Sequence, residues 1–192
     1  MKRKQAIKQM EKEFVMKQKD IHNLIIDFRI AIEKTCDAGL LKRDIAFRSF
    51  PRGCCGDTSE LLAEYLRING IKTIYVCGDE QGQSHAWLVL KDYRVKEPQK
   101  KFMELPSNII KIYNSYSADT YKGPIDVTRY EESDLIDGLI IDITGDQFGE
   151  EPIYFGYMDA YHRKYEFVQA HDSQRLTDGR LCEIYRKIIK NI

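Results

Sequence analysis

The chain has 192 residues, of which 43% are hydrophobic and 11% aromatic, so it can form one globular domain and is too apolar for a disordered segment. Thirty basic and thirty acidic side chains cancel, which removes the overall field that would draw the protein to nucleic acid. Five cysteines without the spacing of a disulfide scaffold, and no apolar run that could serve as a secretion signal or cross a membrane, favour a reducing, cytoplasmic location.

The first segment with regular spacing is N-terminal. Apolar residues recur at helical intervals from Gln5 to about Lys34 without a proline or glycine, which predicts one long helix or two. Lysines dominate its first half, and we interpret them as a solvated helix face, because no aromatic residues are interleaved with them. Residues 1–36 are therefore predicted to be a helical extension of a single domain that covers residues 1–192.

The central part of the chain alternates between helix and strand patterns. A turn at residues 50–53 precedes an apolar stripe that predicts a helix over residues 55–69, ended by Gly70. Runs rich in β-branched residues predict a hairpin of two strands. The remaining elements are predicted as follows: hairpin strands over 72–77 and 85–90, further strands over 139–144 and 152–158, and a final amphipathic helix over 180–192.

A long segment separates the second and third predicted strands. Residues 92–137 carry charged, aromatic and turn residues, and unstructured loops of this length are uncommon in compact domains. We therefore predict an insertion that contains one or two helices.

Two adjacent cysteines stand at the start of the predicted central helix. Unpaired backbone amides and the helix dipole favour negative charge there, so a thiolate forms more readily than elsewhere. Cys55 is the better candidate, since Ser59 lies on the same helix face and would let the helix approach the sheet. Adjacent cysteines cannot easily share one metal ion and no C-x-x-C spacing occurs, so we expect no metal and no other cofactor. The three other cysteines are predicted to be core or half-buried residues, namely Cys36, Cys77 and Cys182.

A histidine and an aspartate fit the same chemistry. His85 begins an apolar strand, with Trp87 on the same face, where the indole would shield the imidazole from water. Asp142 lies inside an apolar strand, where its burial is costly unless a neighbour such as His85 pairs with it. We predict a catalytic triad of Cys55, His85 and Asp142, with Trp87 and Cys54 as substrate-binding neighbours. The other histidines are interpreted as ordinary polar residues, namely His22, His162 and His171.

These three segments, in this order, resemble the transglutaminase-like core of the papain-like superfamily. The resemblance rests on Gly53-Cys54-Cys55 with the helix that ends at Gly70, on His85-Ala86-Trp87, and on Asp142-Ile143-Thr144. It implies an α+β papain-like fold, in which N-terminal helices and the cysteine-bearing helix pack on an antiparallel sheet. Ile143 stands where the family has proline, and the long insertion replaces a short link. Arylamine N-acetyltransferases have a similar turn, but with one more glycine and in longer chains.

The resemblance implies thiol-dependent acyl transfer on amide bonds of a peptide or protein substrate, with neither membrane nor nucleic acid as partner. We expect hydrolysis by a cysteine peptidase or deamidase, because water is always present as the second nucleophile. An amine acceptor would make the protein a transglutaminase or N-acyltransferase instead. In a different class, the three residues would be vestigial in a binding or regulatory module. For the insertion, two interpretations stay open: it folds over one end of the cleft and selects the substrate through its tyrosines and lysines such as Lys96, Lys100 and Lys101, or it is only a packed decoration of the sheet.

Overall fold

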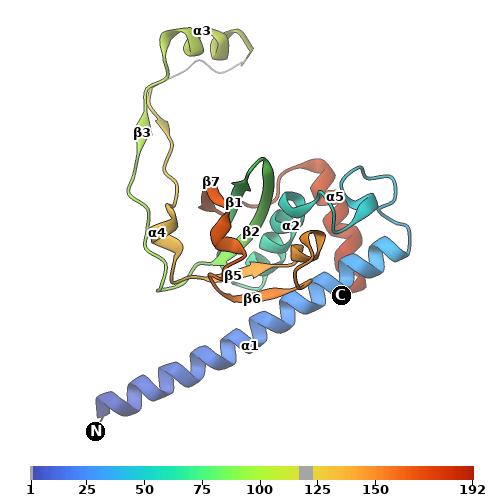
Figure 1. Ribbon diagram of the computed structural model, residues 1–192, viewed down its shortest axis with the longest axis vertical. Coiled ribbons are helices and arrows are strands. Elements are labelled where there is room, and N and C mark those ends of the chain that lie inside the picture. The colour runs from blue at the N-terminus through green and yellow to red at the C-terminus, as the bar shows by residue number, and fades with distance from the viewer. Residues whose placement is uncertain (1, 117–122) are drawn as a thin grey trace.

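The computed structural model describes residues 2–116 and 123–192, and side chains in residues 17–111 and 123–192. Residue 1, residues 117–122 and the lysine side chains before residue 17, which fall in the predicted extension and insertion, lie outside this description. The fold is α+β, as predicted, with helices packed on an antiparallel sheet (Figure 1). The helices are α1 (Lys2–Asp37), α2 (Cys55–Ile68), α3 (Ser107–Tyr116), α4 (Glu132–Leu135) and α5 (Gly179–Ile188). The strands are β1 (Thr73–Glu80), β2 (Gln83–Leu90), β3 (Phe102–Met103), β4 (Ile125–Asp126), β5 (Leu139–Asp142), β6 (Tyr154–Tyr157) and β7 (Glu166–Asp172).

The main sheet has five strands in the order β6-β5-β2-β1-β7, and all neighbouring pairs are antiparallel. β1 and β2 form the predicted hairpin, with Thr73 opposite Leu90 and Gly78 opposite His85. β5 pairs with β2, with Ile141 opposite Leu88. The insertion therefore leaves the sheet after β2 and returns in the neighbouring strand, so the strands that carry His85 and Asp142 are adjacent.

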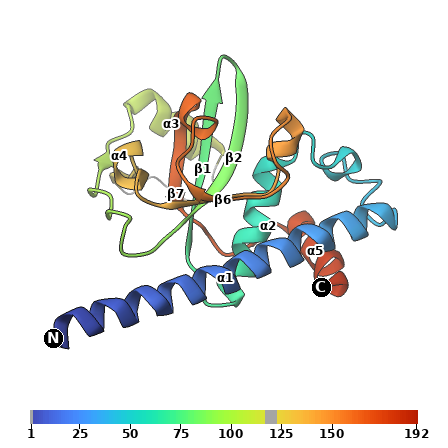
Figure 2. The same ribbon diagram turned by 60° about the horizontal axis from the view of Figure 1, so that its bottom comes forward.

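Two apolar clusters cover the two faces of this sheet. The first packs α1, α2 and α5 against one face, where side chains such as Leu61, Leu88 and Ile141 are fully buried. Figure 2 shows α1 running across this helical layer. The second cluster covers the other face with Leu135 and with tyrosines from the segment around Tyr161. Alternate residues of β2 therefore enter two different cores.

The N-terminal helix is one continuous helix, and its second half belongs to the core. The apolar residues of that half are buried, namely Ile21, Ile25, Phe28, Ala31 and Ile32. At the C-terminal end of this helix, Thr35 Oγ1 accepts from Asn191 Nδ2 over 2.9 Å, which joins α1 to the last residues of the described chain. The second half of α1 is thus part of the domain core and not only an extension of the domain.

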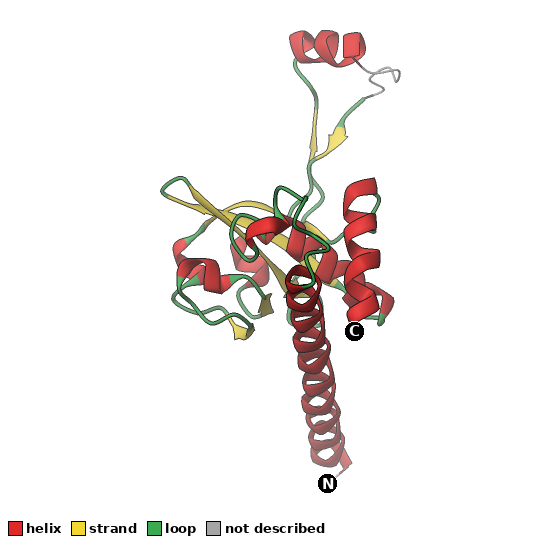
Figure 3. Ribbon diagram, turned by 90° about the vertical axis from the view of Figure 1, so that its right-hand side faces the viewer, coloured by secondary structure: helices red, strands yellow, loops and turns green. Residues whose placement is uncertain are grey.

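The insertion contains the helices α3 and α4, in agreement with the predicted one or two helices. The short strands β3 and β4 pair as a ribbon that carries α3 away from the sheet, as Figures 1 and 3 show from two directions. The ribbon bonds to itself, for example from Val127 N to Lys101 O, and it projects outward. The expectation that the insertion folds over the cleft is therefore not met in this arrangement.

One strand of the five-stranded sheet, β7, was not predicted from the sequence. β7 lies at the edge, and most of its residues are exposed, so it lacks the apolar alternation that marks a half-buried strand. In the part of the chain that the structure describes, no helix combines the length and the apolar composition needed to cross a bilayer.

Candidate active site

Cys55 is the first residue of α2 and is partly exposed. The chain enters the helix through Gly53, which has a φ of +72°, a left-handed conformation that favours glycine. Thr58 N donates to Cys54 O over 2.8 Å and closes the first turn. The Cys55 thiol therefore stands at the helix end where free amides and the helix dipole favour a thiolate.

Cys54 occupies a different environment from its neighbour. Its side chain is only 2% exposed, and its thiol donates to Pro51 O over 3.2 Å. Burial raises the pKa of this thiol to about 12, in spite of a bond from Thr58. The prediction that Cys54 contacts substrate is thus not supported, since the side chain points into the core. Of the two adjacent cysteines, only Cys55 is partly exposed.

A hydrogen bond brings α2 against the strand that carries the histidine. Ser59, one turn after Cys55, is buried and donates from Oγ to the carbonyl of Ala86 over 3.2 Å. Ala86 directly follows His85 in β2. The small Ser59 thus allows the close approach that the sequence predicted, and it sets Cys55 beside His85.

His85 and Asp142 form the predicted pair on neighbouring strands. His85 Nε2 lies 2.8 Å from Asp142 Oδ2, and both side chains are buried. The other oxygen of Asp142 accepts from Thr144 N over 2.8 Å and from Thr144 Oγ1 over 3.2 Å. Every bond to the carboxylate thus favours its charged form, and the orientation of His85 is set through Nε2.

The pKa values of the three groups shift in the directions that a thiolate and an imidazolium require. Burial by itself raises the pKa of the Cys55 thiol, but the interaction with His85, together with the amides of Ala86 and Gly56, brings it below its ordinary value. Burial lowers the pKa of His85, but the bond to Asp142 and the contact with Cys55 outweigh this effect and raise it to about 9. The pKa of the Asp142 carboxyl is held well below its usual range, because burial, which raises it, is outweighed by the interactions with His162 and His85. The three groups therefore stabilise one another's charged forms.

The remaining nitrogen of the imidazole is free to act. His85 Nδ1 is buried and has no hydrogen-bond partner among the described residues, while Cys55 is the neighbour with which the ring interacts. Aromatic rings hold the imidazole in place: Phe148 meets it edge-on at 5.1 Å, and Trp87 lies tilted at 5.6 Å. Trp87 is fully buried beside the ring, as expected of a residue that shields the imidazole. Its burial does not support the prediction that it also binds substrate.

A second histidine belongs to this site, although the sequence analysis treated it as an ordinary polar residue. His162 is 1% exposed, and its Nε2 lies 3.5 Å from Asp142 Oδ2. Its Nδ1 lies 2.7 Å from Asp159 Oδ1. An isolated histidine has no sequence pattern that reveals a long-range contact. The only local signal was the three-residue spacing of Asp159 and His162, which is compatible with the hydrogen bonds between these two residues.

Two further residues brace the loops of the site and were also missed. Arg29 of α1 is buried and donates to Ile143 O and, through two nitrogens, to the carboxylate of Asp146. Gln147 accepts from Gly53 N over 3.2 Å and donates to Thr144 O over 3.0 Å. Gln147 thus joins the turn before the cysteine to the loop after the aspartate.

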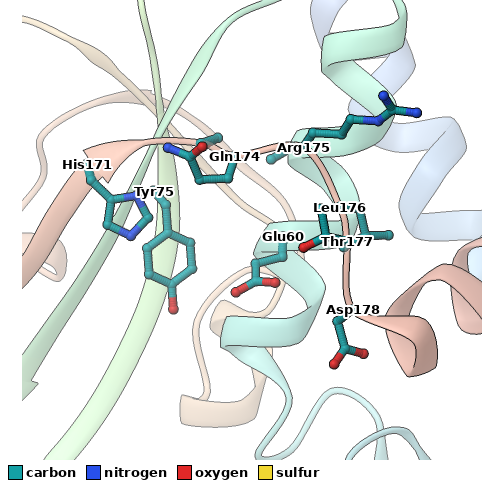
Figure 4. A pocket seen from close by; sticks show the side chains of 10 residues that line it. Glu60, Tyr75, His171, Gln174, Arg175, Leu176, Thr177 and Asp178 are labelled. Atoms are coloured by element: carbon teal, nitrogen blue, oxygen red, sulfur yellow. The ribbon is translucent and has the colours of Figure 1, made fainter. Parts of the chain in front are cut away.

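A cavity of about 150 Å³ opens beside α2 at Glu60 and Ala63 (Figure 4). The ring of Tyr75 stacks on His171 at 5.4 Å, and Glu60 points into the same space from α2. The Tyr75 hydroxyl reaches the turn with the nucleophile, because a Cβ built on Gly56 would lie 3.2 Å from it. Tyr75 therefore joins the cavity to the turn that carries the candidate nucleophile, and neither Cys55 nor Gly56 lines the cavity itself.

One group of side chains in the described part of the chain has metal-ligand geometry. The ligand atoms of His85, Asp142 and His162 lie within 4.8 Å of one another. A zinc ion at this point would take the Nε2 lone pair of His85 and break its 2.8 Å bond to Asp142. We interpret the group as a polar cluster around one carboxylate, since His85 Nε2 and His162 Nδ1 are already hydrogen-bonded to Asp142 and Asp159.

Comparisons of the chain with protein-family models, with curated proteins and with solved structures find no match. The geometry of the site therefore carries the functional argument.

Proposed function

We propose that the protein catalyses thiol-dependent acyl transfer on amide bonds, with Cys55 as nucleophile, His85 as acid and base, and Asp142 as the group that orients His85. The observation that carries this proposal is the His85 to Asp142 bond of 2.8 Å beside a thiol whose pKa lies below its ordinary value. A buried carboxylate on one imidazole nitrogen and a thiol near the other is the arrangement that nucleophilic catalysis requires.

In the proposed reaction, the thiolate of Cys55 attacks the carbonyl carbon of an amide and forms a carbon–sulfur bond. The imidazolium of His85 gives its proton to the nitrogen that leaves, so the carbon–nitrogen bond breaks and an amine is released. The Cys55 amide at the start of α2 is the natural donor to the oxyanion. Water, deprotonated by His85, then hydrolyses the thioester and releases the acid and the free thiol.

The order of elements supports a papain-like, transglutaminase-like core as part of the proposal. A helix that begins with the nucleophile is followed by a strand with the histidine, and the strand with the aspartate lies next to it in the sheet. The cavity lined by Glu60 and Tyr75 is where we propose that a side chain of the peptide or protein substrate sits. Hydrolysis is the preferred outcome, and an amine in place of water would give a transglutaminase or N-acyltransferase.

Mass spectrometry of a proteome incubated with wild-type protein or with Cys55→Ala tests the proposal. New termini would identify a peptidase, deamidated glutamines a deamidase, and cross-links a transglutaminase. Alkylation of Cys55 by iodoacetamide at pH 6 provides a test without a substrate, because an ordinary thiol hardly reacts there. A thiol that reacts like free cysteine would favour a binding or regulatory module with a vestigial triad.

A further inference from the structure

We propose that His162, held by Asp159, is a positioning residue that fixes Asp142 for its bond with His85. This inference rests on the proposed function and extends it from three residues to five. The five form a continuous line from a partly exposed carboxylate at Asp159, through His162, Asp142 and His85, to the thiol of Cys55.

The first argument is the way in which Asp159 fixes the His162 ring. One carboxylate oxygen of Asp159 accepts from the backbone N of His162 over 2.9 Å, and the same oxygen lies 2.7 Å from Nδ1 of the ring. The backbone and the side chain of His162 are thus held by one acceptor. The ring is left with Nε2 directed toward Asp142.

The second argument concerns the oxygen that His162 faces. Oδ1 of Asp142 is occupied by Thr144, whereas Oδ2 receives His85 and also lies 3.5 Å from His162 Nε2. The two imidazoles therefore meet the same oxygen from different sides. The contact with His162 is the foremost of the interactions that lower the pKa of Asp142 against its burial.

The third argument is that the ring cannot leave this position easily. Tyr161 meets it edge-on at 4.9 Å, Trp87 edge-on at 5.2 Å, and Tyr154 lies tilted at 5.2 Å. His162 Nε2 is buried and has no hydrogen-bond partner among the described residues, so the charge of the Asp142 carboxylate, 3.5 Å away, is what compensates its loss of water. Burial of such a nitrogen for packing alone would be unfavourable.

Replacement of His162 should therefore weaken the hold of Asp142 on His85 and reduce the thiolate fraction of Cys55. The titratable and charged groups that face His162 are Asp142 from β5, Asp159 after β6, His85 from β2, and the phenols of Tyr154 and Tyr161. The groups that face Cys55 are His85, Tyr75, Cys77 and the adjacent Cys54.

The experiment measures the rate of Cys55 alkylation by iodoacetamide from pH 5 to pH 9, in the full chain, for wild type and variants. His162→Phe keeps a planar ring and removes both nitrogens. We expect its rate at pH 6 to fall at least about tenfold, which corresponds to a shift of the pH profile by one unit. His162→Gln, which retains an N–H group, should restore part of that loss. Asp159→Ala should change the rate in the same direction by about threefold.

Tyr154→Phe is the matched control. It preserves the ring beside His162 and removes only the hydroxyl bond to the carbonyl of Tyr157, so it reports on the packing of the same cluster. We expect a wild-type pH profile. Thermal unfolding of each variant accompanies the kinetics, because a merely structural role would lower the melting temperature and leave the profile in place.

An unchanged profile in His162→Phe would overturn the proposal, whatever its melting temperature. If that variant does not fold, Asp159→Ala decides, since Asp159 is partly exposed, and an unchanged profile there counts equally against the proposal. Failure of the proposed function looks different, because wild-type Cys55 would then already react like an ordinary thiol.

Discussion

Arg29, in the long N-terminal helix, donates from its guanidinium to the carbonyl of Ile143, the residue directly after Asp142. The same group binds Asp146 and lies 4.5 Å above the ring of Phe50, just before the cysteine turn. One buried cation thus fixes the end of the strand that presents the candidate aspartate.

Arg29→Met should cost about 3 kcal/mol of unfolding free energy, because it leaves Asp146 and a carbonyl without their partner. Urea denaturation measures this loss. Glu33→Gln is the matched control, since Glu33 is half exposed and its pair with Arg29 should contribute less than about 1 kcal/mol. Equal costs for the two variants would contradict the bracing role of Arg29.

The two adjacent cysteines should differ in their reactivity toward iodoacetamide. Cys55→Ala should abolish labelling at pH 6, whereas Cys54→Ala should keep it and lose about 1 kcal/mol of stability, because Cys54 is buried in the core. Peptide mapping of the alkylated protein identifies the modified residue. Labelling that disappears with Cys54 would reverse the assignment.

The pH dependence of labelling follows from the pKa shifts. The pKa of Cys55 is lowered, so its thiolate persists below the range of an ordinary thiol, and His85, with a pKa raised to about 9, stays protonated beside it up to that pH. The ion pair should therefore exist from below neutral pH to about pH 9. Cys36 and Cys54, with pKa values raised to about 11 and about 12, should remain unlabelled over this range. Labelling of all cysteines in parallel would contradict the prediction.

Asp142→Asn should impair the site more than the fold. The amide still accepts from Thr144, but its N–H group favours the His85 tautomer that has its proton on Nδ1, where the thiol proton must go. We expect the rate of Cys55 alkylation at pH 6 to fall at least about tenfold, with a stability change below about 2 kcal/mol. A large loss of stability with normal labelling would assign Asp142 a structural role.

The projecting arm should be dispensable for folding. Replacement of residues 102–126 by a short glycine-serine link removes the β3–β4 ribbon and α3, which extend away from the sheet. We expect the melting temperature and the labelling of Cys55 to stay as in wild type. Changed labelling of Cys55 in the folded, shortened protein would show that the arm reaches the site after all.

The sequence allowed most of the helices and strands to be predicted, because their apolar spacing is regular. It also allowed His85 and Asp142 to be paired, since an acid in an apolar strand needs a partner. β7 was missed because an edge strand carries exposed residues on both faces. Arg29 and the contact of His162 with Asp142 were missed because the partners are distant in sequence, as in the separation of 114 positions between Arg29 and Ile143, and no local pattern encodes such contacts. Cys54 and Trp87 were predicted to bind substrate because they lie close to Cys55 and His85 in the sequence. Proximity in sequence does not show whether a side chain is buried, and both of these are.

The bond between Thr35 and Asn191 has a consequence for how the protein is made. During synthesis, α1 leaves the ribosome before the sheet and α5, and its partners Asp146 and Asn191 are added more than a hundred residues after it. Such distant contacts close large loops, which slows folding compared with local contacts. Until those residues arrive, the apolar side of the helix is unprotected, and a chaperone that shields it would be expected to raise the yield of active protein.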